Sequence, residues 1–76
     1  MIPNDALTNA LRSLKFEFKD QTQRVTIWKQ KGTTKRVIVH KRDFHDEITA
    51  RSVLTQAGMP LGAIQQFIET ARRRRH

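Results

Sequence analysis

Apolar residues recur along this chain with a period that is helical near both ends and two residues long in the middle. Near the N-terminus, Leu7, Leu11 and Leu14 are spaced to share one face of a helix. The segment Pro3-Asn4-Asp5 before them supplies an oxygen that can cap the first turn. The pattern therefore predicts an N-terminal helix with a buried leucine stripe.

Three runs in the middle of the chain have the two-residue period of strands. The run 15–19 alternates phenylalanine with charged residues, whereas RVTIWKQ (24–30) and KRVIVHK (35–41) are rich in β-branched residues. A turn at 20–23 separates the first two runs, and Gly32 with its neighbouring threonines separates the last two. We therefore expect three consecutive antiparallel strands.

The pairing of the second and third runs decides which side chains are exposed. If Val25 and Ile27 share the buried face with the valines of the third run, the opposite face carries basic, polar and apolar side chains together. It then carries Arg24, Thr26, Trp28, Gln30, Arg36, Ile38 and His40. In this register Trp28 is exposed among cations; the alternative is a register shifted by one residue, in which Trp28 is structural.

The helical period returns after the third strand. Asp43 or Asp46 can cap a helix that ends at Gly58. Pro60 is suited to the first turn of a further helix. The two apolar stripes consist of Ala50, Val53, Leu54 and Ala57, and of Leu61, Ile64, Phe67, Ile68 and Ala71.

The order of elements predicts one α+β domain over residues 1–76 with α-β-β-β-α-α topology and a basic C-terminal tail at 72–76. The last two helices are expected at about 46–57 and 60–72. A three-stranded antiparallel sheet with its helices on one face buries all three helical stripes and leaves the other sheet face in water.

Composition narrows the class of protein. The chain of 76 residues has a formal net charge of +8 and no cysteine, which excludes disulfides, a thiolate nucleophile and cysteine-bound zinc. Polar residues near the start stand where a signal peptide needs a long apolar stretch, and no later run is long enough to cross a bilayer. We therefore expect a cytoplasmic protein that does not bind membranes.

Basic residues are concentrated in two places. Seven of them and no acid lie between Arg24 and Arg42, and four consecutive arginines follow Ala71. Such a distribution favours a polyanion as partner, with cations on phosphates and Trp28 on an unpaired base. The predicted nucleic-acid-binding residues are Arg24, Trp28, Lys29, Lys31, Lys35, Arg36, Lys41, Arg42, Arg72, Arg73, Arg74 and Arg75. The alternative is a solvated face whose lysines protect an edge strand from aggregation.

Two histidines lie near the expected junction between the third strand and the second helix. His40 and His45 have Asp43, Asp46 and Glu47 nearby, so either imidazole could act as a general base. The group lacks the dense spacing of a metal site. We predict no metal, no cofactor and no catalysis, with His40 and His45 as the candidates if the protein is an RNase.

The stretch RVIVHKRDFHDEITARSVLTQAGMPLGAIQQFIE (36–69) resembles the C-terminal half of HicA-type small proteins. In that family a strand and a short basic or histidine-containing loop precede a helix that ends in a pattern close to ILKQAGL. The corresponding residues here are Val53-Leu54-Thr55-Gln56-Ala57-Gly58-Met59. The predicted order of elements is also that of double-stranded RNA-binding domains.

The resemblance implies RNA binding and, in the toxin members, mRNA cleavage restrained by an antitoxin partner. Those members carry a glycine-serine-histidine-histidine motif at the start of the second strand, and its histidine serves the cleavage. This chain has Thr22-Gln23-Arg24-Val25-Thr26 at that place, without glycine or histidine. We therefore expect an RNA-binding protein that lacks the cleavage activity of the toxins.

Three other functions are consistent with the sequence. The last two helices could form a helix-turn-helix in which Gln65, Gln66 and Arg72 enter a DNA major groove. Alternatively, the basic face could bind an acidic protein, such as an antitoxin-like partner. Finally, Trp28 and Ile38 could form the patch of a homodimer.

Overall fold

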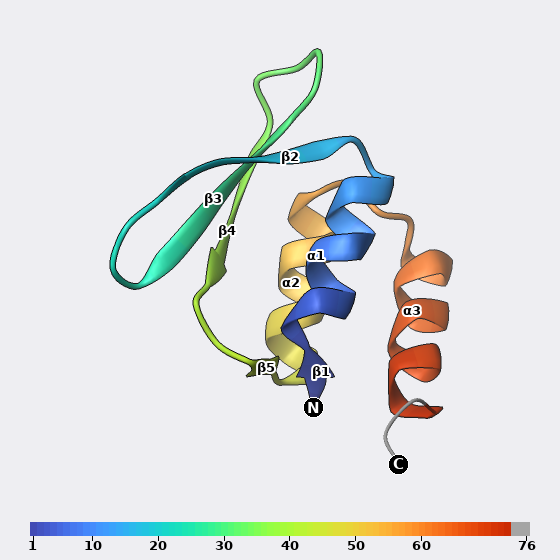
Figure 1. Cartoon of the computed structure of the whole chain (residues 1–76). Coiled ribbons are helices and arrows are strands. Elements are labelled where there is room, and N and C mark those ends of the chain that lie inside the picture. The colour runs from blue at the N-terminus through green and yellow to red at the C-terminus, as the bar shows by residue number, and fades with distance from the viewer. Residues whose placement is uncertain (74–76) are drawn as a thin grey trace.

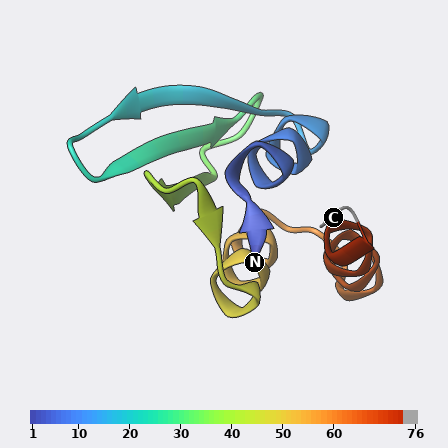
Figure 2. The ribbon, with the colours of Figure 1, turned by 60° about the horizontal axis from the view of Figure 1, so that its bottom comes forward.

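The computed structural model describes residues 1–73 and contains a three-stranded antiparallel sheet together with three helices. The elements in chain order are β1 (Ile2–Pro3), α1 (Asn4–Ser13), β2 (Phe16–Gln21), β3 (Val25–Gln30), β4 (Arg36–His40), β5 (Phe44–His45), α2 (Glu47–Gln56) and α3 (Leu61–Arg73). Figure 1 shows their arrangement, and Figure 2 shows the helices on one side of the sheet. The predicted α+β class and the order of the main elements are confirmed.

The register between β3 and β4 differs from the prediction by one residue. Trp28 pairs with Val37 and Thr26 pairs with Val39, whereas Ile27 lies opposite Ile38 on the open face. This register places the largest apolar side chain of β3 beneath the helices, and burying an indole removes more apolar surface from water than burying a valine or an isoleucine. The prediction that Trp28 lies on the exposed face is therefore wrong.

Strand β2 is longer than predicted, because Asp20 and Gln21 continue it instead of forming the turn. The register shifts between Phe18 and Asp20, so that Phe18 pairs with Trp28 and Asp20 with Ile27. A bulge of this kind places one extra residue in the strand and increases its twist. The turn is confined to the residues that follow Gln21.

Two short strands, β1 and β5, are not predicted by the sequence pattern. Ile2 of β1 pairs with His45 of β5, and the backbone N–H of Asn4 donates to the carbonyl oxygen of Asp43 at 2.8 Å. A two-residue strand has no detectable period. This pairing joins the start of α1 to the segment before α2, and it buries Ile2 completely.

The core lies between the sheet and the three helices. α1 contributes Leu7 and Leu11, and α3 contributes Ile64 and Ile68, all of them almost fully buried. The other large buried apolar residues are Ile2, Phe16, Trp28, Val37, Val39, Val53 and Leu54. Each predicted helical stripe thus packs inward. At the margin of the α3 stripe, Phe67 is partly exposed and Leu61 is largely exposed.

The ends of α2 follow its sequence signals. The Oδ1 atom of Asp46 accepts a hydrogen bond from the Thr49 N–H at 2.7 Å, which confirms Asp46 as the N-cap. After the helix, Gly58 adopts φ +90°, and the Met59 N–H donates to the Leu54 carbonyl at 3.0 Å. This hydrogen-bond pattern is that of a glycine-terminated helix.

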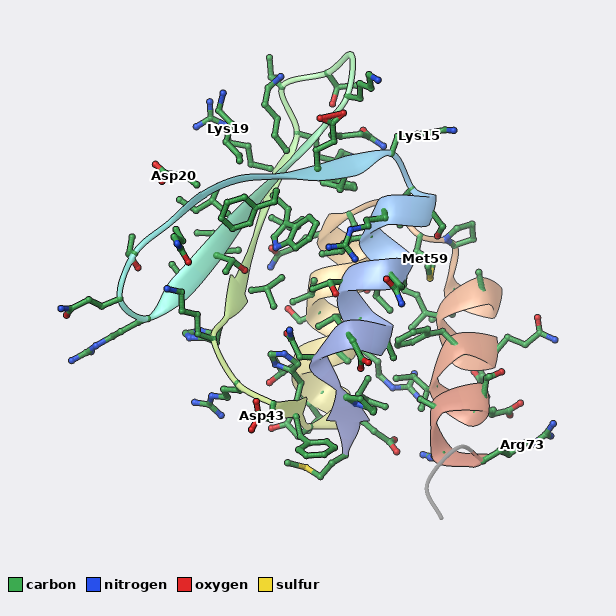
Figure 3. The ribbon with its side chains drawn as sticks, viewed as in Figure 1. Lys15, Lys19, Asp20, Asp43, Met59 and Arg73 are labelled. Carbon is green, nitrogen blue, oxygen red and sulfur yellow. The ribbon has the colours of Figure 1, made fainter. Side chains whose placement is uncertain are left out.

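The end of α1 is different, because Lys15 takes the left-handed conformation there with φ 73°. Its side chain points into solvent (Figure 3). We expect Lys15→Gly to raise the free energy of unfolding by about 0.5–1 kcal/mol, since left-handed strain of ~1–2 kcal/mol exceeds the entropy that glycine adds to the unfolded chain. Urea denaturation would measure this. Lys15→Ala is the control, because it keeps the Cβ atom and should leave the midpoint nearly unchanged.

Among residues 1–73, no helix is both long enough and apolar enough to cross a membrane.

Candidate nucleic-acid interface

The open face of the sheet carries both signs of charge. Lys29 pairs across the sheet with Arg36 on one side and with Glu17 on the other. Because directly opposed residues share a face, β2 places the carboxylate of Glu17 beside these cations. Asp20 adds a second carboxylate, opposite Ile27. The hairpin has no acid in its own sequence, but the neighbouring strand supplies two.

Two lysines at the tip of the β3–β4 hairpin have partners within the fold. The Nζ atom of Lys31 lies 3.8 Å from Oε1 of Glu17, and both side chains are largely exposed. The Nζ atom of Lys35 approaches the C-terminus of α2, where it lies 3.0 Å from the position of a Cβ atom on Gly58. A cation there complements the helix dipole. Lys35 thus lies against the helical layer and not on the open sheet face.

A second group of cations lies at the opposite end of the hairpin. Arg24 precedes β3, and Lys41 and Arg42 follow β4; we call these three residues the basal cluster. The Lys41 N–H donates to the Arg24 carbonyl at 2.9 Å, so the two segments are adjacent. All three residues are exposed, and none forms a salt bridge within residues 1–73.

A hollow of about 320 Å³ adjoins the basal cluster. Its lining residues are Asn4, Thr26, His40, Lys41, Arg42 and Asp43. Figure 3 labels Asp43 at this end of the molecule, far from Lys15 and Lys19. Two permanent cations and one carboxylate line the hollow together with other polar groups, which suits an anionic oxygen better than an apolar ligand.

Trp28 is not available to a nucleic acid, because only 3% of its surface is exposed. Its Nε1–H donates to Oγ1 of Thr26 at 3.0 Å, which satisfies the buried indole. Phe18 packs edge-on against the ring at 6.0 Å, and the guanidinium of Arg12 lies 5.2 Å from the ring centre. The predicted base-stacking role of Trp28 is therefore wrong, and the residue belongs to the core.

The C-terminal arginines fall into three groups. Arg72 donates to Glu47 from Nε at 2.6 Å and from its terminal nitrogen at 2.5 Å, which links the end of α3 to the start of α2. This pair lowers the pKa of Glu47 through the hydrogen bond and the nearby charge. Arg73 is exposed and points into solvent (Figure 3). Arg74 and Arg75 lie outside the described residues.

His45 is buried, with 2% of its surface exposed. Its Nε2 atom lies 2.9 Å from Oδ1 of Asn4, so the tautomer with its proton on Nε2 donates to that oxygen. Nδ1 has no hydrogen-bond partner within residues 1–73. Burial, aided by the cation of Arg42, lowers the pKa of His45. A buried neutral imidazole cannot reach a substrate, so His45 is withdrawn as a catalytic candidate, whereas His40 is exposed.

The depressed pKa of His45 makes stability depend on pH in a defined window. The unfolded chain takes up a proton near the ordinary value of 6.5, whereas the folded imidazole does so at lower pH. The free energy of unfolding should therefore fall as the pH decreases from about 6.5 towards the folded pKa of His45. Asp46 and Glu47, whose pKa values are also lowered, act in a more acidic window.

Urea denaturation at a series of pH values between 8 and 5 measures this effect. The control is His45→Gln, which removes the titrating group and retains an amide that can bond to Asn4. Its stability should change less than that of the native chain over the same interval. Equal pH dependence in the two proteins would show that His45 does not carry the effect.

Sequence reasoning missed two contributors to the site. The sequence pattern indicates only a capping role for Asn4, yet this residue lines the hollow and its Oδ1 atom lies 2.9 Å from Nε2 of His45. Thr26 also lines the hollow, with its Oγ1 donating to the Val39 carbonyl at 3.1 Å. No local pattern could identify the role of Asn4, because the β1–β5 pairing is what brings the start of the chain to residues 44 and 45.

Within residues 1–73, no group of three or more histidine or acidic side chains is arranged to hold a metal ion. Around the hollow, the structure brings together Lys41 and Arg42 of the basal cluster with Asn4, Thr26, His40 and the carboxylate of Asp43. Comparison of the chain with protein-family models, with curated proteins and with solved structures finds no match.

Proposed function

We propose that this protein binds RNA, preferentially in duplex form, through the phosphate backbone and without cleaving it. The observation that carries the proposal is the basal cluster, in which Arg24, Lys41 and Arg42 are exposed on adjacent segments and form no salt bridge among the described residues. Cations of this kind bind phosphates regardless of base sequence. Sequence preference should therefore be slight, and the cytoplasm is the location that we expect for such a protein.

A second contact is available farther along the hairpin. Lys29 and Arg36 lie opposite one another on the open face. They are five residues from Arg24 and Lys41 respectively, or about 17 Å along an extended strand. This pair lies on the open face and would contact RNA there, as a site separate from the basal cluster. Glu17 weakens the second contact, so we assign the larger share of the affinity to the basal cluster.

The absence of cleavage follows from the histidines. The place where HicA-type toxins carry their histidine motif is occupied by Thr22-Gln23-Arg24. His45 is buried, and the exposed His40 has no carboxylate bonded to it in the described chain. The resemblance to HicA-type proteins, with their antitoxin partners, remains a prediction.

The arrangement of α2 and α3 disfavours the helix-turn-helix alternative. In that motif the two helices cross at about 90–120°. Here α2 and α3 run side by side in opposite directions in Figures 1 and 2. The exposed side of α3 also carries the acid Glu69, which would face the phosphates of a bound duplex. We therefore rank DNA binding by α3 below RNA binding by the hairpin.

Fluorescence anisotropy with labelled nucleic acids tests the proposal. The probes are an RNA duplex of about 16 base pairs, the matched DNA duplex and the single-stranded RNA. If about three phosphates are neutralised, the affinity for duplex RNA should fall roughly 40-fold between about 50 and 200 mM salt. Tighter binding of duplex DNA, or no binding at low salt, would reject the proposal. The length of the RNA after incubation shows whether it is cleaved.

A further inference from the structure

Strand β4 has an open edge, because the order of the sheet is β2-β3-β4. The Gln30 N–H donates to the Lys35 carbonyl, and the Lys41 N–H donates to the Arg24 carbonyl, each at 2.9 Å. Hydrogen bonding alternates along an antiparallel strand, so Val37 and Val39 also point their backbone groups at β3. The backbone N–H and C=O groups of Arg36, Ile38 and His40 therefore point away from the sheet.

A groove runs along this edge between β4 and α2. Its volume is about 530 Å³, and Ile38 and His40 line one side, whereas Ile48 and Val53 line the other. Ile48 is 81% exposed and Ile38 is 54% exposed, although both are large aliphatic side chains. An edge with free hydrogen-bonding groups beside exposed aliphatic side chains has the properties of a site for an added strand.

Charge decides which strand can occupy the groove. Antiparallel pairing of β4 with a second copy about Ile38 would set Arg36 against His40 and bring Lys35 near Lys41, between two chains that each carry a net charge of +8. Like charges on opposed strands are destabilising. Carboxylates opposite Arg36 and near Lys41 would instead be attracted.

We propose that the open edge of β4 binds an extended acidic segment of a partner protein as a fourth strand of the sheet. Side chains of the added strand alternate between the two faces. Those opposite Val37 and Val39 lie on the helical side, where apolar residues meet Ile48. Those opposite Arg36 and His40 lie on the open face, where a carboxylate meets the guanidinium of Arg36. The segment thus has an apolar centre flanked by acids.

The peptide Asp-Glu-Val-Thr-Val-Glu-Asp tests the proposal. It is long enough to pair with all five residues of β4, and it has an apolar centre flanked by acids. Titration of the whole protein is followed by amide hydrogen exchange and by chemical shifts. The peptide should slow exchange at the N–H groups of Arg36, Ile38 and His40. A peptide with proline in place of its threonine should bind at least ten-fold more weakly, because proline removes a central donor and disfavours strand pairing.

Ile48→Gln provides the test on the protein side. Because Ile48 is exposed, the change should leave the fold intact and weaken the peptide about ten-fold. Leu61→Gln is the matched control: Leu61 is 72% exposed on α3, away from the groove, and its replacement should have no effect. Equal affinity for native protein and Ile48→Gln would overturn the proposal. Protection of the same three amides by the RNA duplex would also overturn the proposal, because the edge of β4 would then be part of the RNA-binding surface.

Discussion

Trp28→Ala is expected to remove most of the stability of the fold. Truncation of a buried tryptophan costs about 3–5 kcal/mol. A domain of this size has a free energy of unfolding of only about 5 kcal/mol. The change also removes the partner of Thr26 Oγ1 and the ring contacts with Phe18 and Arg12. Far-UV circular dichroism during heating and urea denaturation would measure the loss.

Trp28→Phe is the control for this prediction, because it retains an aromatic ring and loses the Nε1–H donor. It should stay folded at 25 °C with a lower midpoint. A Trp28→Ala protein that kept the native midpoint but lost RNA binding would contradict this prediction. The ring would then lie on the exposed face, as in the register expected from the sequence. The emission of native Trp28 should be that of a buried indole and should change little when RNA is added.

Simultaneous replacement of Lys41 and Arg42 by alanine is expected to weaken duplex RNA binding by at least ten-fold at about 50 mM salt. The two residues supply two of the three cations in the basal cluster. Each phosphate contact that is lost reduces the salt slope by about 1, so the slope should fall from about −3 to about −1. Anisotropy titrations across the salt series would measure both quantities. Both side chains are exposed, and the circular dichroism spectrum should be unchanged.

The control is the double variant Lys15→Ala and Lys19→Ala, which removes the same amount of charge from β2 and its approach. In Figure 3 both lysines lie far from Asp43, which is one of the residues that line the hollow. This control should retain nearly all of the affinity and most of the salt slope. If both double variants lost the same affinity, net charge rather than the basal cluster would explain the binding.

The main elements could be predicted because each has a period of its own. The leucines of α1 repeat at helical spacing over about two turns and the stripe of α3 over about three, and Asp46, Gly58 and Pro60 delimit the helices. The register between β3 and β4 could not be predicted in the same way. β3 carries apolar residues on both faces, Val25 and Ile27 on one and Trp28 on the other. Only packing against the helices selects between them.

The sequence predicts which residues of the candidate site are charged, but not which of them lie close together in the fold. The sequence shows which residues are cations, but not that Glu17 lies beside Lys31 or that Glu47 binds Arg72. Those partners come from other elements, as far apart as residues 47 and 72. The same holds for Lys35, which reaches the end of α2. The three cations of the basal cluster are exposed and form no salt bridge within residues 1–73, although the carboxylate of Asp43 lines the hollow that adjoins them.

Chemical shifts of the backbone amides during titration with the RNA duplex would show which surface of the protein binds RNA. We expect the largest changes at Arg24, Lys41 and Arg42, smaller changes at Lys29 and Arg36, and none along the exposed side of α3. Changes confined to Gln65, Gln66 and the end of α3 would contradict this expectation, and would favour binding by the last helix in place of the hairpin.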